Sequence, residues 1–258
     1  MRAIGEGTNY QRHFCFMCFS ASVSYSAAAV LVTTGVYAVR QARRLLPPYL
    51  MWALVPVFFG LQQAFEGRVW QELDAGDAVA AVPFALGFHF FSHFLWLWWL
   101  PLASYLVESG QAGMIGRVRK RVFAGCATFG AFSGTLVYSV MLFHPEWMTV
   151  AVRQHSINYS FSVPWRSSIH LPITPAALYA MTILVPLLFS SHRLIRIFGV
   201  LAALSMVLTS AAYDYAYVSV WCFFAAALSL YLVYMIRHLV AAGQGGHTVP
   251  ARSDGLLP

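Results

Sequence analysis

The amino-acid sequence predicts an all-α fold: a polytopic membrane helix bundle of about seven transmembrane helices, with the N-terminus outside and the C-terminus cytoplasmic. Composition is the first observation behind this prediction. Of the 258 residues, 59% are hydrophobic and 10% are charged, whereas soluble domains carry about 25% charged residues. The other two observations are a series of apolar runs and an uneven distribution of charge between the loops.

Each predicted helix is an apolar run close to the length that crosses a bilayer, which is about 20 residues. The runs cover approximately residues 19–39, 48–70, 79–106, 120–143, 171–190, 195–212 and 215–238. Six or eight spans are the alternatives, because the runs are interrupted differently on different hydropathy scales. Short loops leave no room for a soluble domain, so residues 17–240 form one transmembrane domain and residues 241–258 a disordered cytoplasmic tail.

The distribution of charged residues between the loops predicts which side of the membrane each loop faces. Basic residues follow the first, third, fifth and seventh runs, and these loops are expected to be cytoplasmic. They include Arg43, Arg117, Arg193 and Arg237. The loops on the other side are acidic and include Glu72, Asp74, Asp77 and Glu146. The net charge of +7 is therefore a topology signal, and we predict the lipid bilayer, not nucleic acid, as the partner of this chain.

Polar residues inside the apolar runs are the candidate site, because such groups are costly in hydrocarbon and are functional by default. Three lie in the second run, two in the third and two at the start of the last. These residues are Gln62, Gln63, Glu66, His89, His93, Asp214 and Cys222. Gln62 and Glu66 share a helix face because they are four residues apart.

The two histidines suggest a metal site. His89 and His93 are four residues apart, so both imidazoles face one side of a helix and can bind one ion. Glu66 would be the third ligand, zinc the favoured metal, and Glu66 and Asp214 the candidate catalytic carboxylates of a hydrolase. The alternative is a pair of histidines that form hydrogen bonds between helices. Ser92 adds a hydroxyl but is expected on a different face of the helix. Haem is disfavoured, since stacked histidines cannot be the two axial ligands of one haem.

Residues 17–21 read Met-Cys-Phe-Ser-Ala, and Gln62-Gln63, Glu66-Gly67 and residues 219–224 (Ser-Val-Trp-Cys-Phe-Phe) continue a shared pattern. In these motifs the chain resembles an uncharacterised family of bacterial multi-span membrane proteins that open with Met-Cys-Phe-Ser-Ala. The resemblance implies a bacterial cytoplasmic (inner) membrane protein but no mechanism. It also implies that residues 1–16 are an N-terminal extension upstream of the true start.

Cysteines and small residues give further hypotheses. Cys15 and Cys18 form a CxxC motif, which suits a soft metal, a redox pair or simple packing. Cys18 is a pocket candidate because it could meet Cys222 across the bundle. Gly130 and Gly134 form a small-xxx-small pattern that allows close helix packing within the chain or in a homo-oligomer.

Three functions are consistent with these residues. The first is a metal-dependent, membrane-embedded hydrolase with an outward-facing polar pocket. The second is a permease for a small solute or metal ion, against which we find no inverted repeat. The third is a sensor or assembly factor whose long outer loop, about residues 144–170, engages a protein partner.

Overall fold

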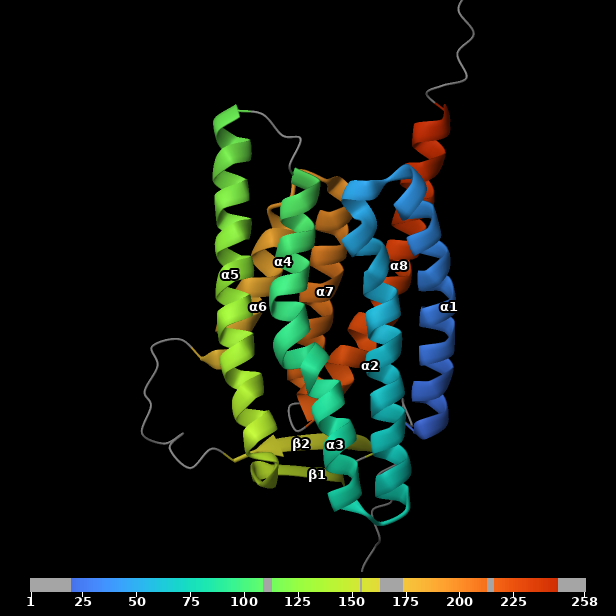
Figure 1. Ribbon diagram of the computed structural model, residues 1–258, viewed down its shortest axis with the longest axis vertical. Coiled ribbons are helices and arrows are strands. Elements are labelled where there is room, and N and C mark those ends of the chain that lie inside the picture. Colours follow the sequence, from blue (N-terminus) through green and yellow to red (C-terminus); the bar gives the residue numbers. More distant parts are fainter. Residues whose placement is uncertain (1–19, 109–112, 154, 163–173, 213–215, 246–258) are drawn as a thin grey trace, which may run out of the picture.

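The helices run side by side along one axis in the computed structural model, which describes residues 20–108, 113–153, 155–162, 174–212 and 216–245 (Figure 1). Their order is α1 (Ala21–Leu45), α2 (Leu50–Asp74), α3 (Ala78–His89), α4 (Trp96–Val107), α5 (Gly113–Phe143), α6 (Pro175–Leu188), α7 (Arg193–Ala212) and α8 (Tyr217–Gly245). A π-helical segment, η2 (Phe90–Leu95), joins α3 to α4 in one continuous rod. With α3, η2 and α4 counted together as one rod, each helix corresponds to one predicted apolar run.

The structure confirms the prediction of a bundle of long apolar helices. Within the described residues, five helices are long and apolar enough to cross a membrane: α1, the rod Ala78–Val107, α5, α7 and α8. The helix α6 is apolar but has only 14 residues, and α2 carries the polar residues of the candidate site. The helix α8 continues to Gly245, past the predicted start of the tail at residue 241.

Helix boundaries follow local signals. The hydroxyl of Ser20 caps α1 by accepting from the Val23 backbone, and Thr174 caps α6 in the same way ahead of Pro175. Two prolines, Pro47 and Pro48, form a 3-10 turn between α1 and α2. This turn connects α1 and α2, which pack side by side as an antiparallel pair of helices.

The loop between α5 and α6 is not irregular, and here the all-α prediction was incomplete. It contains an antiparallel hairpin of β1 (Met148–Arg153) and β2 (Ser156–Phe161), with Val150 opposite Tyr159. Met148 and Val150 of β1 are buried and alternate with exposed residues, the pattern of a half-buried strand, and Ile157 of β2 is buried as well. They pack against α2, α3 and α8, so the hairpin lies across one end of the bundle, which we call the hairpin end (Figure 1).

The opposite end, called the basic end, holds the C-termini of α1, α4 and α8 and the N-terminus of α5 (Figure 1). A buried carboxylate connects the helices there. Glu108, just beyond α4, accepts hydrogen bonds from Ser190 Oγ (2.9 Å), Ser191 N (2.6 Å) and Ser191 Oγ (2.8 Å), and pairs with Arg119 at 3.3 Å.

These contacts decide the charge of Glu108. Burial raises the pKa of its carboxyl, but the hydrogen bonds from Ser191 and Ser190 and the charge of Arg119 outweigh burial, so the pKa lies below its ordinary value. The ionised carboxylate therefore joins α4, α5 and the α6–α7 turn. Sequence analysis did not identify Glu108.

The small residues of α5 are used within the chain. A side chain at Gly130 would meet the Leu97 carbonyl, and one at Gly134 would lie 3.1 Å from the carbonyl oxygen of His93. Both glycines are buried, so an oligomer would need another surface, and self-association stays a prediction. Residues 1–16, Cys15, Cys18 and the proposed start at Met17 lie outside the described residues.

Candidate functional site

A buried carboxylate lies where α2 meets α8. Glu66 is 3% exposed, and Gln62 and Gln63 are fully buried on the same helix. Gln63 Nε2 donates to Glu66 Oε2 at 3.0 Å, and the Ser219 hydroxyl from α8 donates to Glu66 Oε1. Arg68 pairs with Glu72 at 2.6 Å instead. The carboxylate of Glu66 is therefore held by neutral donors, with no cationic partner among the described side chains.

Gln62 extends this group toward α4 and α8. Its Oε1 accepts from Trp96 Nε1 at 2.9 Å, and its side chain lies beside the buried thiol of Cys222. Its Nε2 makes no hydrogen bond of regular geometry within the described residues. We call Gln62, Gln63, Glu66, Ser219 and Cys222 the Glu66 cluster.

The two histidines meet as their spacing predicts. His89 Nδ1 and His93 Nδ1 are 3.0 Å apart. Ser92, which we expected on a different face, has its hydroxyl 3.2 Å from His89 Nδ1 and 2.9 Å from His93 Nδ1. The expectation failed because Ser92 and His93 lie in the π-helical η2, where the wider turn changes the angular spacing of side chains. We call these three residues the histidine cluster.

Tyr159 of β2 lies between the two clusters. Its ring stacks on Phe88 at 5.1 Å and meets His89 edge-on at 4.7 Å. Burial, followed by the nearby charge of Glu66, raises the pKa of its hydroxyl well above the ordinary value. The hydroxyl therefore stays protonated as a donor, yet it has no acceptor in the described part of the chain.

Sequence analysis missed Tyr159. The available signal was the alternation of apolar residues along residues 156–161, which predicts a strand with Ile157 and Tyr159 on one face. The position of that strand against the polar helices was not available from the sequence.

A cavity of about 60 Å³ adjoins the histidine cluster on the side of the hairpin. It holds few water molecules, since each occupies about 30 Å³ in the liquid. It is lined by His89, His93, Met141, Met148, Tyr159, Ser160, Phe161 and Val218. Tyr159 thus lines this space and also lies near Glu66.

The three-ligand metal site is not supported. No group of three or more His, Cys, Asp or Glu side chains in the described ranges is arranged to hold a metal ion. Glu66 is engaged by Ser219 and Gln63, while the two histidines contact each other and Ser92. Asp214, the second predicted catalytic carboxylate, lies outside the described residues.

A family model described as "Family of unknown function (DUF6629)" matches residues 17–245. The match is consistent with the resemblance to an uncharacterised family, and it starts at residue 17, where the Met-Cys-Phe-Ser-Ala segment begins. No curated protein and no solved structure matches the chain significantly.

Proposed function

Since the chain belongs to DUF6629, a family of unknown function, we propose its function from the site itself: an integral membrane protein that binds a small polar solute at Glu66, as a permease does. One observation carries this proposal. Beside the Glu66 carboxylate, the buried atoms Gln63 Oε1 and Tyr159 Oη lack hydrogen-bond partners in the described structure, and Gln62 Nε2 has only the weakly accepting sulfur of Cys222 near it.

Unpaired buried polar atoms are rare in native proteins, because each costs about 1–3 kcal/mol. Here two of the atoms are donors and one is an acceptor, and Gln63 Oε1 and Tyr159 Oη lie near the Glu66 carboxylate. A solute that carries hydrogen-bond donors, such as an amine or hydroxyl, together with an acceptor would complement all four groups. The Glu66 cluster therefore suits a small polar solute better than an apolar one.

We propose a seven-span topology with the N-terminus outside, in a bacterial cytoplasmic membrane. The support is the segregation of charge: Arg43 and Arg44 end α1 at the basic end, whereas Asp74 and Asp77 lie in the α2–α3 turn near the hairpin. Basic loops stay cytoplasmic. Reporters fused at Gly113 and after Gly245 should both report the cytoplasm, and an external signal from either contradicts this topology.

We also propose that the solute reaches the Glu66 cluster from the hairpin end. The accessibility of Cys222 tests this route, in a chain whose other three cysteines are replaced by serine. A membrane-impermeant methanethiosulfonate reagent should label Cys222 slowly from the outer side of oriented vesicles. Tyr159→Ala should accelerate labelling about tenfold, because it removes two aromatic contacts of about 0.5–1.5 kcal/mol each that hold the site closed.

Tyr138→Ala is the matched control, since Tyr138 is also partly buried but bonds the Leu86 carbonyl at 3.3 Å on the other side of α3. It should leave the labelling rate of Cys222 unchanged. Labelling from the basic side alone, or equal rates for the Tyr159 and Tyr138 variants, contradicts entry from the hairpin end.

A metal-dependent hydrolase is the second candidate. Its support is the histidine cluster, where two imidazole nitrogens lie 3.0 Å apart beside a cavity. A two-histidine zinc site with water in the remaining positions would be chemically reasonable. Metal analysis of purified protein decides this: the hydrolase requires bound zinc that a His89→Ala, His93→Ala double variant loses, and metal-free wild type under zinc-replete conditions excludes it.

A further inference from the structure

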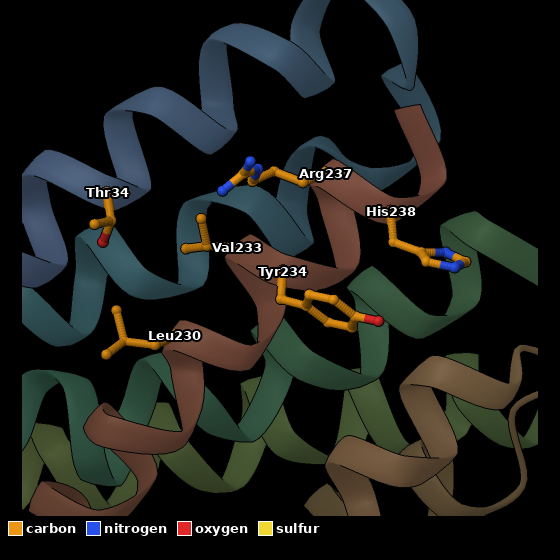
Figure 2. Close-up of a pocket in the computed structure, with 6 residues that line it drawn as sticks. All are labelled: Thr34, Leu230, Val233, Tyr234, Arg237 and His238. Carbon is orange, nitrogen blue, oxygen red and sulfur yellow. The ribbon is translucent and has the colours of Figure 1, made fainter. Parts of the chain in front are cut away.

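A larger cavity, of about 530 Å³, lies away from both clusters, on the surface between α1 and α8. Figure 2 shows Thr34 across from Leu230 and Val233, with Tyr234, Arg237 and His238 further along α8. The five residues of α8 fall on one helix face because they are spaced three and four apart. We call this cavity the α1–α8 groove.

The half of the groove formed by Leu230, Val233 and Thr34 is apolar. Leu230 is 39% exposed and Val233 is partly exposed beside it. The hydroxyl of Thr34 donates to the Val30 carbonyl at 2.7 Å, so its donor is used within α1. This half offers a mostly hydrocarbon surface and no free hydrogen-bond donor from Thr34.

The other half of the groove is polar and basic. Arg237 and His238 are exposed, and the rings of Tyr234 and His238 are 6.0 Å apart. No ion pair of Arg237 occurs among the described residues. Leu230 and Arg237 are seven residues apart on α8, which corresponds to about 10 Å along the helix. Arg43 and Arg44, at the end of α1, lie at the same end of the bundle.

We propose that the α1–α8 groove binds one glycerophospholipid with an anionic headgroup from the cytoplasmic leaflet. The phosphate would lie at Arg237 and His238, and an acyl chain would follow Leu230 and Val233. Charge complementarity supports this occupant, because a basic residue without an ion pair at the membrane surface attracts anionic lipid. The apolar half requires a chain that free phosphate does not have. The proposal depends on the membrane placement of α1 and α8, not on solute binding at Glu66.

The test is native mass spectrometry of the full chain, titrated with phosphatidylglycerol or with phosphatidylcholine of the same acyl chains. Wild type should prefer phosphatidylglycerol. Arg237→Gln should weaken phosphatidylglycerol binding about fivefold, the effect of one basic contact at a membrane surface. Leu230→Trp, which fills the apolar half, should weaken binding of both lipids.

Two controls separate this site from general attraction to charge. Arg196→Gln removes an exposed basic residue from the start of α7, outside the groove, and should leave the lipid preference unchanged. Glu66→Gln should also retain the lipid preference, so a failure of the solute proposal can be distinguished from a failure of the lipid proposal. Equal affinities for the two lipids, an equal effect of Arg196→Gln and Arg237→Gln, or displacement of the lipid by millimolar inorganic phosphate would each overturn the proposal.

Discussion

Replacing Glu66 with glutamine is expected to weaken solute binding at least about 30-fold, because removing one partner of a buried charged contact costs about 2–5 kcal/mol. The substitution keeps the size of the side chain and removes the ionisable carboxyl group. The Ser219 hydroxyl and Gln63 amide, which now donate to the carboxylate, would retain one carbonyl acceptor. The protein should therefore still fold, and the loss should be confined to binding.

Thermal unfolding of purified protein with a panel of amino acids, amines and polyols measures this effect. A solute at 100 times its Kd stabilises the folded state by about 2.7 kcal/mol. At the same concentration, a solute that stabilises wild type to this extent should stabilise Glu66→Gln by no more than about 0.9 kcal/mol, given a roughly 30-fold weaker Kd. Glu72→Gln is the matched control, since Glu72 is on the same helix but forms a surface ion pair with Arg68. A solute that stabilises the Glu66 and Glu72 variants equally would show that its site is elsewhere.

The polar residues of this site could be predicted because their cost in hydrocarbon is a local property of the sequence. Gln62, Gln63 and Glu66 were identified by their place in an apolar run, and their shared helix explains their burial together. Their partners could not be predicted in the same way. Ser219 is 153 residues away from Glu66 along the chain, and helical periodicity states which face is polar but not which helix covers it.

The incorrect expectations have local physical causes. Ser92 was assigned to a different face because regular α-helical spacing was assumed through a segment that is π-helical. The three-ligand metal site required Glu66 and the two histidines to converge, but Tyr159 of the hairpin lies between them. The hairpin was overlooked because short strands give a weaker pattern than long apolar helices.

Glu108 illustrates a signal that was present but not used. It is an acidic residue at the end of the bundle where the other charged positions are basic, so it departs from the pattern that assigns topology. Such an exception indicates a specific partner. In the structure, this carboxylate is fully buried and accepts from the turn that precedes α7.

The contact between α5 and α4 gives the second large effect. Gly130→Ala is expected to destabilise the protein by about 3 kcal/mol or more, the upper part of the range for overpacked cores. The added Cβ would meet the Leu97 carbonyl and approach the Trp98 backbone nitrogen to 3.2 Å. Backbone atoms cannot rotate away as a side chain can, so the two helices must separate. The thermal unfolding midpoint should fall by roughly 6–12 °C for a chain of this size.

Two glycines on the same helix provide graded controls. At Gly125 an added Cβ meets nothing within 4 Å, so Gly125→Ala should be neutral or stabilise by up to about 1 kcal/mol through helix propensity. Gly134→Ala should have an intermediate effect, since its Cβ would lie 3.1 Å from His93 O and Phe94 Cα. Because that contact fixes the backbone of η2, Gly134→Ala should also disturb the histidine cluster. Equal midpoints for the Gly125 and Gly130 variants would show that α5 does not pack this closely on α4.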